Sequence, residues 1–404
     1  MCSSDLWSHS VLKRDLSALY NAHHKGLAAK IPPPQVHYQD YTAWQRRRLQ
    51  GQYLQKLKNY WMEQLSDLPP LELPVDHPRP AAACHQAGSV SFPITSARLA
   101  PLEELCRSEG ATLQMGLLAL VALLLYRHSN QNDIGIGMQI ESRNHPDLAN
   151  LIGSFVNTLP IRARCSPNIS FRQLLNQVKS TCTAANAHQE LPLEQMVEAH
   201  RMERNTSRHP IVQATLELTP YHNPSTINLD GLEAEQNIPE IRTCFSQLEL
   251  EFLLQRDQHG NINATLRYSK ELFKRDRIER LSSHLLNLLA SATQTPDDPS
   301  SSLTLLPEEE RQLISSWQGG PGQKAPDRCI HQLFEQQVAH TPDAIALTFE
   351  GQEISYSDLN RHANELAYKL IYLGVEPGAI VAICLDHSIE LVVGRSEEHT
   401  SELH

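Results

Sequence analysis

Histidine and cysteine are the residue types in this sequence that could bind a metal ion or act as nucleophiles. His23 and His24 are adjacent, and adjacent residues do not share a helix face, so they are poorly spaced to bind one metal ion. A solvated helix end is the simpler interpretation. The eight cysteines are scattered without a CxxC pair, which favours reduced thiols in a cytosolic protein over a disulfide framework or a zinc site.

Short motifs for phosphate binding or hydrolysis are missing from the sequence. It contains no GxGxxG, no GxxxxGK(S/T) and no GxSxG. The net charge of -11 argues against a nucleic-acid partner, and the basic run at 46–48 is explained by a solvated helix face. The longest apolar run, 115–126, is too short to cross a bilayer and predicts a buried core helix.

The elements that would position any site follow from hydrophobic periodicity. Helical patterns cover 8–25 and 40–66, and a proline-rich segment at 68–83 is expected to run extended. Strands and helices then alternate. The expected strands are 89–94, 133–140, 151–163, 211–218, 248–257 and 262–269, and the expected helices are 96–110, 112–128, 170–189, 191–200 and 274–293. This alternation predicts an α/β fold with a mixed sheet.

A second unit is expected after two segments with linker composition, 294–302 and 317–327. Its pattern predicts a helix at 329–342, a hairpin around Gly351, a helix at 357–374 and a buried strand at 379–386. From 404 residues, length alone suggests two or three domains. The residue types by themselves indicate an α/β protein of two units without a complete active site.

Five segments, in order along the chain, closely resemble the later motifs of condensation domains of nonribosomal peptide synthetases. They are VHYQDYTAWQ (36–45), DLPPLELPVDHPRPA (67–81), IGSFVNTLPIR (152–162), HQELPLEQMV (188–197) and RNTSRHPIVQ (204–213). The resemblance implies a V-shaped pair of lobes like chloramphenicol acetyltransferase, with a tunnel between them. Residues 353–394 resemble the N-terminal edge of an adenylation domain, with its first motif around 354–359.

The start of the chain resembles part of the family's active-site motif, HHxxxDGWS. Asp5 matches the motif aspartate, Trp7 and Ser8 match its last two positions, and Leu6 stands where glycine is expected. The two motif histidines would lie at or before position 1 and are absent. The resemblance implies that the aspartate is structural and pairs with an arginine of the second lobe. Arg143, in IESRNHPDL, is the best match for that arginine.

Other residues of the motifs are weaker candidates for the substrate tunnel. For Tyr38, Asp40 and Trp44, packing of a helix onto the core is the simpler interpretation, and a buried, hydrogen-bonded role is equally open for Asn157. His188 and Gln189 end a helix, where a capping role is favoured. The full set of candidates is Asp5 and Arg143 as catalytic-motif residues, and Trp7, Tyr38, Asp40, Trp44, Asn157, His188, Gln189, Arg204 and Arg208 as tunnel or motif residues.

The expected domain organisation has six parts. They are a non-native, adapter-like end at 1–6, the remainder of the first lobe and crossover at 7–83, the second lobe at 84–293, a linker at 294–327, the start of an adenylation domain at 328–394, and an adapter-like tail at 395–404. We therefore expect a cytoplasmic synthetase fragment that is itself inactive.

The implied parent reaction is amide-bond formation between carrier-tethered aminoacyl or peptidyl thioesters. The parent uses phosphopantetheine on its carrier domains, and ATP with magnesium for adenylation, whereas no cofactor or metal is expected on the fragment. Upstream and downstream carrier domains are the expected partners, without nucleic acid or membrane. An ester-forming or other acyltransferase of the same fold and a non-catalytic docking module remain alternatives, and an epimerisation domain is less favoured.

Overall fold

The computed structural model divides into two compact units, Met1–Arg311 (unit 1) and Gln312–His404 (unit 2), which we describe separately. The structure describes residues 5–31, 33–83, 85–200, 206–219, 227–232, 244–246, 248–317, 330–376 and 379–397.

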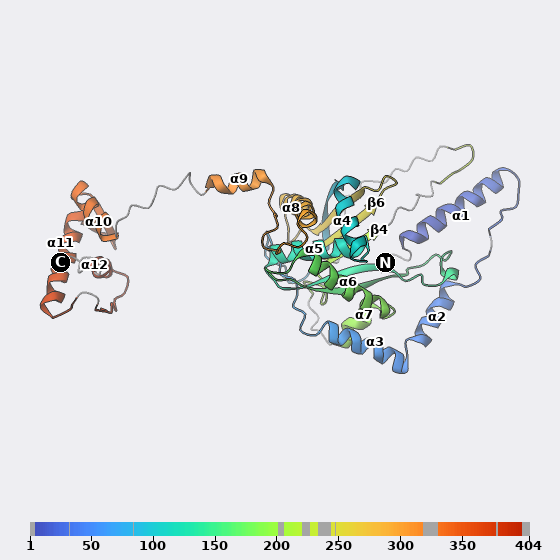
Figure 1. Ribbon diagram of the computed structural model, residues 1–404, viewed down its shortest axis with the longest axis horizontal. Coiled ribbons are helices and arrows are strands. Elements are labelled where there is room, and N and C mark those ends of the chain that lie inside the picture. Colours follow the sequence, from blue (N-terminus) through green and yellow to red (C-terminus); the bar gives the residue numbers. More distant parts are fainter. Residues whose placement is uncertain are drawn as a thin grey trace. The chain divides into compact units, whose positions relative to one another are not determined.

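In the described part of unit 1, seven strands form one mixed sheet in the order β3-β2-β4-β6-β7-β1-β5. Figure 1 labels two neighbouring strands of this sheet, β4 and β6. Their bounds are β1 Gln86–Ile94, β2 Asp133–Glu141, β3 Val156–Arg164, β4 Ala214–Thr219, β5 Cys244–Phe245, β6 Leu250–Arg256 and β7 Ile262–Ser269. β4 runs parallel to both β2 and β6, and the other pairs are antiparallel. The prediction of an α/β fold with a mixed sheet is confirmed.

Helices pack on the apolar side of this sheet. Their bounds are α4 Ser96–Ser108, α5 Leu113–Ser129, α6 Phe171–Ala187 and α8 Arg275–Gln294. α5 packs on β2, α6 on β3, and α8 on β1 and β7. Every residue of α5 from 116 to 126 is buried, which confirms the predicted core helix. Along β7, buried residues alternate with the more accessible Asn263, Thr265 and Arg267, so the opposite side of that strand is polar.

Within the described ranges, no single helix combines the length and apolarity needed to cross a bilayer, and α4 and α5 pass that test only together, across a bend of 108°.

Four further helices lie along the sequence motifs of unit 1: α1 Leu6–His24, α2 Tyr38–Arg48, α3 Gly51–Gln64 and α7 Leu193–His200. The predicted continuous helical pattern over 40–66 is wrong at its centre. Gln50 is extended and Gly51 has a φ of +58°, a conformation that favours glycine, so the chain turns between α2 and α3. α3 packs against α7, with Leu57 and Trp61 fully buried.

The proline-rich segment runs extended, as predicted, and contributes to the core. Leu68, Leu71 and Leu73 are buried. The backbone N–H of Leu71 donates to the side chain of Gln213 (2.7 Å). An extended segment cannot satisfy its backbone N–H and C=O groups by itself. Gln213, just before β4, satisfies one of them.

The first part of the predicted linker at 294–327 packs on the rest of unit 1. The N–H of Ser300 donates to the carbonyl of Ile169 (2.8 Å), and Arg127 donates to the carbonyl of Ser300 (2.8 Å). Leu303 is buried. A further helix, α9 (Glu308–Trp317), follows and spans the division between the two units. Residues 318–327 lie outside the described residues.

Unit 2 contains α10 (Ile330–His340), a hairpin of β8 (Ile345–Phe349) and β9 (Gln352–Ser355), then α11 (Tyr356–Tyr372) and α12 (Ile389–Glu397). The predicted hairpin and the two predicted helices are present. The predicted buried strand at 379–386 is not: these residues form neither helix nor strand, and Ile380 is 99% exposed. A buried strand needs neighbouring strands, and in the described part of unit 2 β8 and β9 pair only with each other.

Candidate functional site

Asp5 begins α1 as its N-cap residue. Its Oδ1 accepts a hydrogen bond from the backbone N–H of Ser8 (2.8 Å), which satisfies one of the free donors at the helix start. Its Oδ2 accepts from the backbone N–H of Phe155 (3.1 Å). The Asp5 side chain is only 1% exposed. A single carboxylate therefore joins the first turn of α1 to the loop between β2 and β3.

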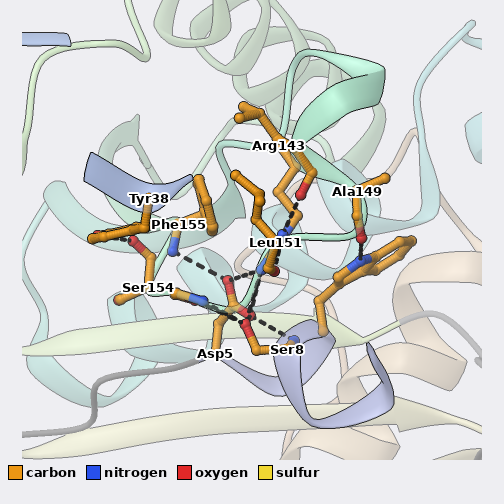
Figure 2. A network of polar contacts seen from close by, with 11 residues as sticks. Asp5, Ser8, Tyr38, Arg143, Ala149, Leu151, Ser154 and Phe155 are labelled. Atoms are coloured by element: carbon orange, nitrogen blue, oxygen red, sulfur yellow. Dashed lines mark hydrogen bonds and ion pairs between the residues drawn. The ribbon is translucent and has the colours of Figure 1, made fainter. Parts of the chain in front are cut away.

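Arg143 lies just after β2 and points at the same carboxylate (Figure 2). Its Nη2 donates to Oδ1 (2.9 Å) and Oδ2 (3.1 Å) of Asp5, and the Arg143 side chain is 6% exposed. Its Nη1 donates to the carbonyl oxygens of Leu148 (2.5 Å) and Leu151 (2.9 Å). Arg143 thus holds its own loop closed and forms a buried ion pair with a residue 138 positions earlier.

Ser8 adds a second link between the same segments. Its hydroxyl oxygen lies 2.7 Å from Oδ1 of Asp5 and 2.9 Å from the carbonyl oxygen of Gly153, and can donate to either. The same oxygen accepts from Nη2 of Arg143 (3.0 Å) and from the N–H of Gly153 (3.1 Å). The buried polar atoms of this cluster therefore satisfy one another, as a network at low dielectric requires, except for Nε of Arg143, which has no hydrogen-bond partner. We call Asp5, Ser8, Arg143, Gly153 and Phe155 the latch.

The electrostatics of the latch favour an ionised Asp5. Burial acts to raise the pKa of Asp5, but hydrogen bonds from Ser8, Arg143 and Phe155 outweigh it and lower the pKa below its usual value. The Arg143 guanidinium also lies over the Phe155 ring, 4.1 Å from its centroid. With both carboxylate oxygens engaged, Asp5 is suited to hold structure and not to transfer protons.

An aromatic layer supports the latch from α2. The hydroxyl of Tyr38 donates to the carbonyl of Ser154 (2.8 Å), and its ring meets Phe155 edge-on with centroids 5.2 Å apart. The Tyr38 ring also covers Gly153 so closely that a Cβ atom there would lie 2.3 Å from it. Glycine is therefore required at 153 by close approach. Tyr41 also packs against Phe155, at 4.8 Å between centroids.

The other predicted residues of α1 and α2 have structural contacts. The indole N–H of Trp7 donates to the carbonyl of Ala149 (2.7 Å), in the loop between β2 and β3. Asp40 accepts from the backbone N–H of His37 (2.8 Å) and closes the first turn of α2. Trp44 is 47% exposed and lies beside the Arg48 guanidinium.

Asn157 and His188 also have partners that explain them structurally. The amide of Asn157 donates to the carbonyls of Gln189 and Leu191, both at 2.9 Å. His188 is the C-cap of α6, and its ring stacks on Tyr60 with centroids 3.8 Å apart. Gln189 contributes a backbone carbonyl to this arrangement. These residues fasten β3 to the segment before α7, and the predicted capping position of His188 is confirmed.

The last two predicted residues are Arg204 and Arg208. Arg208 forms an ion pair with Glu72 of the proline-rich segment, with 2.5 Å between Nη1 and Oε1. No latch residue takes part in this ion pair. Arg204 lies outside the described residues. The sequence therefore predicted two of the latch residues, Asp5 and Arg143, whose ion pair is present.

Sequence reasoning assigned no role to Ser8, Gly153 or Phe155. One signal was available for Ser8, because Asp5 stands three residues before the helical pattern at 8–25, and an N-cap aspartate accepts from a backbone N–H two or three residues later. Gly153 contacts Ser8 and Phe155 contacts Asp5, in each case more than 140 residues earlier in the chain. No local sequence pattern records such a contact. Within the described residues no group of histidine, cysteine, aspartate or glutamate side chains could hold a metal ion. A cavity of about 570 Å³ lies beside the latch, lined by residues of α2, β3 and the 189–194 segment.

Comparison with known proteins places these features in a family context. A family model described as Condensation domain matches residues 3–315, and one described as AMP-binding enzyme matches residues 334–394. Malpinin synthetase of Mortierella alpina is 36% identical over 393 residues, covering 97% of this chain and 5% of that protein. The dimodular nonribosomal peptide synthase of Bacillus subtilis strain 168 is 36% identical over 402 residues, covering 96% of this chain and 17% of that protein.

A solved structure has a similar fold. The X-domain in its complex with OxyB, from teicoplanin biosynthesis, superposes with a TM-score of 0.67 at 26% identity, covering 76% of this chain and 68% of that chain. The present chain spans only a small part of the malpinin synthetase and of the dimodular synthase.

Proposed function

The chain belongs to the condensation-domain family and continues into the start of an AMP-binding domain, and on this premise we propose that it is part of a peptide-synthetase elongation module. The parent would join an aminoacyl or peptidyl thioester on one carrier domain to the amine of an aminoacyl group on another. The following AMP-binding domain would activate the amino acid with ATP and magnesium. Carrier domains bearing phosphopantetheine are the proposed partners.

The observation that carries this proposal is the Asp5–Arg143 ion pair. In the motif HHxxxDGWS the aspartate follows the histidine pair closely, so whatever fixes Asp5 also fixes the segment that would present those histidines. Arg143 fixes Asp5 from the loop that directly follows β2, a strand of the sheet. We infer that the latch sets the position of the histidine segment relative to the sheet, which is a positioning role in catalysis.

Within this proposal the chain from Met1 to His404 is inactive by itself. Condensation needs a group beside the attacking amine to accept or orient its proton, and the latch leaves no such group free. Both oxygens of Asp5 accept hydrogen bonds within the latch. The AMP-binding match covers only residues 334–394, without a phosphate-binding glycine-rich motif. We expect neither peptide formation nor ATP–pyrophosphate exchange.

Partner docking without catalysis is the second candidate. It is favoured by the likeness to the X-domain, a protein whose structure was solved in a complex with OxyB. The two candidates differ in one respect: a catalytic domain must recover condensation when a histidine pair precedes Asp5, whereas a docking domain need not.

A chimera tests the proposal. Residues 5–315 would replace the matching stretch of the dimodular synthase, so that the host sequence supplies the histidine pair and an intact AMP-binding domain. We expect peptide formation by the chimera and none by the chain alone, with ATP–pyrophosphate exchange by the host domain as the control. A folded chimera that activates and loads both amino acids but forms no peptide would favour docking and overturn the proposal.

A further inference from the structure

In the described part of unit 1, β3 pairs with β2 alone, so β3 is an edge strand of the sheet. Two contacts at its ends show which backbone groups face β2. The N–H of Ser142 donates to the carbonyl of Phe155 (2.7 Å). The N–H of Cys165 donates to the carbonyl of Asn132 (2.7 Å). Because hydrogen-bonded pairs alternate along an antiparallel ladder, the odd-numbered residues of β3 bond to β2 and the even-numbered residues face the outer edge.

The middle of this outer edge offers no N–H group to a further strand. The N–H of Thr158 donates to Oδ1 of the preceding Asn157 (2.9 Å). Pro160 has no N–H, and it is buried. Proline and occupied N–H groups protect edge strands against pairing with other chains.

Other segments of the chain lie along the far half of the edge. The N–H of Arg164 donates to the side chain of Gln177 (2.7 Å). The guanidinium of Arg162 donates to the carbonyls of Gln64 (3.0 Å) and Ser66 (2.8 Å), which places the end of α3 beside this part of the strand. The edge is therefore occupied here by the protein itself.

At Val156 the edge is open. Neither the N–H nor the C=O of Val156 has a hydrogen-bond partner among the residues that the structure describes, and Val156 is 44% exposed. The C=O of Thr158 faces the same way and is also without a partner there. Residues 156–158 line the cavity of about 570 Å³ beside the latch. One backbone donor and two acceptors thus face this cavity.

α2 contributes aromatic rings to the lining of the same cavity. Tyr41 and Trp44 both line it, and their rings stack with centroids 6.0 Å apart. Trp44 is 47% exposed. The cavity therefore combines exposed aromatic surface with unpaired backbone groups, and its volume is in the range of small-ligand sites.

We propose that this cavity binds a short extended peptide segment of another protein, which adds as a strand to β3 at Val156 and Thr158. The peptide donates N–H groups to the carbonyls of Val156 and Thr158 and accepts from the N–H of Val156. An apolar side chain of the peptide covers the rings of Tyr41 and Trp44. Main-chain bonds of this kind give affinity, and the side-chain contact selects the sequence.

A second copy of the chain fits this edge less well than a separate peptide. The β3 strand of the copy carries the same proline at 160 and the same occupied N–H group at Thr158. Two edges that both lack these donors cannot complete a ladder with one another.

Calorimetric titration of the 404-residue chain with the capped pentapeptide acetyl-TVTVT-amide tests the proposal. Two N-methylated isomers are compared with it, one methylated at both valine nitrogens and one at all three threonine nitrogens. Alternate N–H groups of a strand point to the same side, so only one of these sets faces β3. We expect the pentapeptide and one isomer to bind, and the other isomer to bind about tenfold more weakly or less.

Substitutions in the chain locate the site. Val156→Pro removes the outward N–H but no bond to β2, and should weaken binding about tenfold. Val156→Thr keeps the N–H and is the matched control. Trp44→Ala should also weaken binding, whereas Trp317→Ala, at an exposed tryptophan of α9, should not.

Binding of the pentapeptide and of one isomer only, weakened by Val156→Pro and not by Val156→Thr, supports the proposal. Equal binding of both isomers, or no binding of the pentapeptide, overturns it. Equal affinities of Val156→Pro and Val156→Thr overturn it as well. Self-association in sedimentation velocity that Val156→Pro abolishes, without peptide binding, would identify a second copy as the occupant and would also overturn it.

Discussion

At the scale of single residues, the latch is a buried ion pair with almost every polar atom satisfied. Such pairs are costly to break on one side only, because the remaining charge stays buried without its partner. Asp5 and Arg143 also differ from surface pairs such as Arg14–Asp15, where the arginine side chain is 51% exposed. This contrast gives matched substitutions for measuring what the latch contributes.

Replacement of Arg143 should destabilise unit 1 strongly. We expect Arg143→Ala to lower the free energy of unfolding by about 3–5 kcal/mol, because Asp5 keeps a buried charge without its partner. Arg143→Lys should recover only part of this, since an ammonium cannot contact both carboxylate oxygens and two loop carbonyls at once. Urea unfolding of the 404-residue chain measures both. Arg14→Ala, the control, should cost less than about 1 kcal/mol.

The same pair predicts a dependence on pH. The pKa of Asp5 is lowered in the folded state, so its contribution to stability is present above the unfolded value near 3.8 and is lost as the pH falls through the folded value. In Arg143→Ala the buried carboxylate is instead relieved by protonation. The difference in unfolding free energy between wild type and variant should therefore shrink from pH 7 to pH 4. A difference that stays constant would show that Asp5 is not the group affected.

Gly153 offers a steric test of the aromatic layer. A methyl group at 153 would overlap the Tyr38 ring, so Gly153→Ala should cost about 1–3 kcal/mol. Removing the ring should relieve the overlap, and Gly153→Ala should cost much less in a Tyr38→Ala background. A double-mutant cycle by thermal or urea unfolding measures this coupling. Additive effects would mean that Tyr38 and Gly153 do not constrain one another.

At the scale of elements, α1 and α3 carry similar apolar patterns with opposite outcomes. α3 buries Leu57 and Trp61 against the core of unit 1. α1 leaves a stripe of Leu12, Leu16 and Leu19, each about half exposed at 53%, 48% and 51%. The spacing of four and three residues places these leucines on one face. Exposed apolar stripes of this kind favour association.

Substitution of the stripe should improve solubility without loss of stability. We expect the triple change Leu12→Glu, Leu16→Lys and Leu19→Glu to raise the concentration at which the chain stays monomeric, with its unfolding free energy nearly unchanged. Trp61→Ala, in contrast, should cost about 3–5 kcal/mol, because it empties a packed site. Light scattering and urea unfolding separate the two effects. A stripe variant that unfolds as easily as Trp61→Ala would show that α1 is packed after all.

Prediction from sequence succeeded where a segment carries its own pattern. Periodicity found the core helix α5 and the strands β2, β6 and β7 with small errors at their ends. It failed for 379–386, whose apolar run needs neighbouring strands to become a strand, and at Gly51, whose positive φ ends a helical pattern that continues on both sides. The 294–302 segment has linker composition but is held by backbone contacts to residues far away in sequence.

At the scale of the whole molecule, only part of the candidate site could be predicted from the sequence. Asp5 and Arg143 were paired through motif resemblance, not through any local signal. The contributions of Ser8, Gly153 and Phe155 required the fold, because each contact joins the first turn of α1 to a loop more than 130 residues later. The central claim that results is that the latch ties the histidine-bearing motif to the sheet of the condensation domain.

The most direct test of this claim is condensation by the dimodular chimera with and without Arg143. We predict that Arg143→Ala lowers the rate of peptide formation by the folded chimera by about tenfold or more, consistent with the effect of a misplaced catalytic group. ATP–pyrophosphate exchange by the host AMP-binding domain should be unchanged, and Arg14→Ala should condense at the parent's rate. Equal condensation by the Arg143→Ala and parent chimeras would contradict the account.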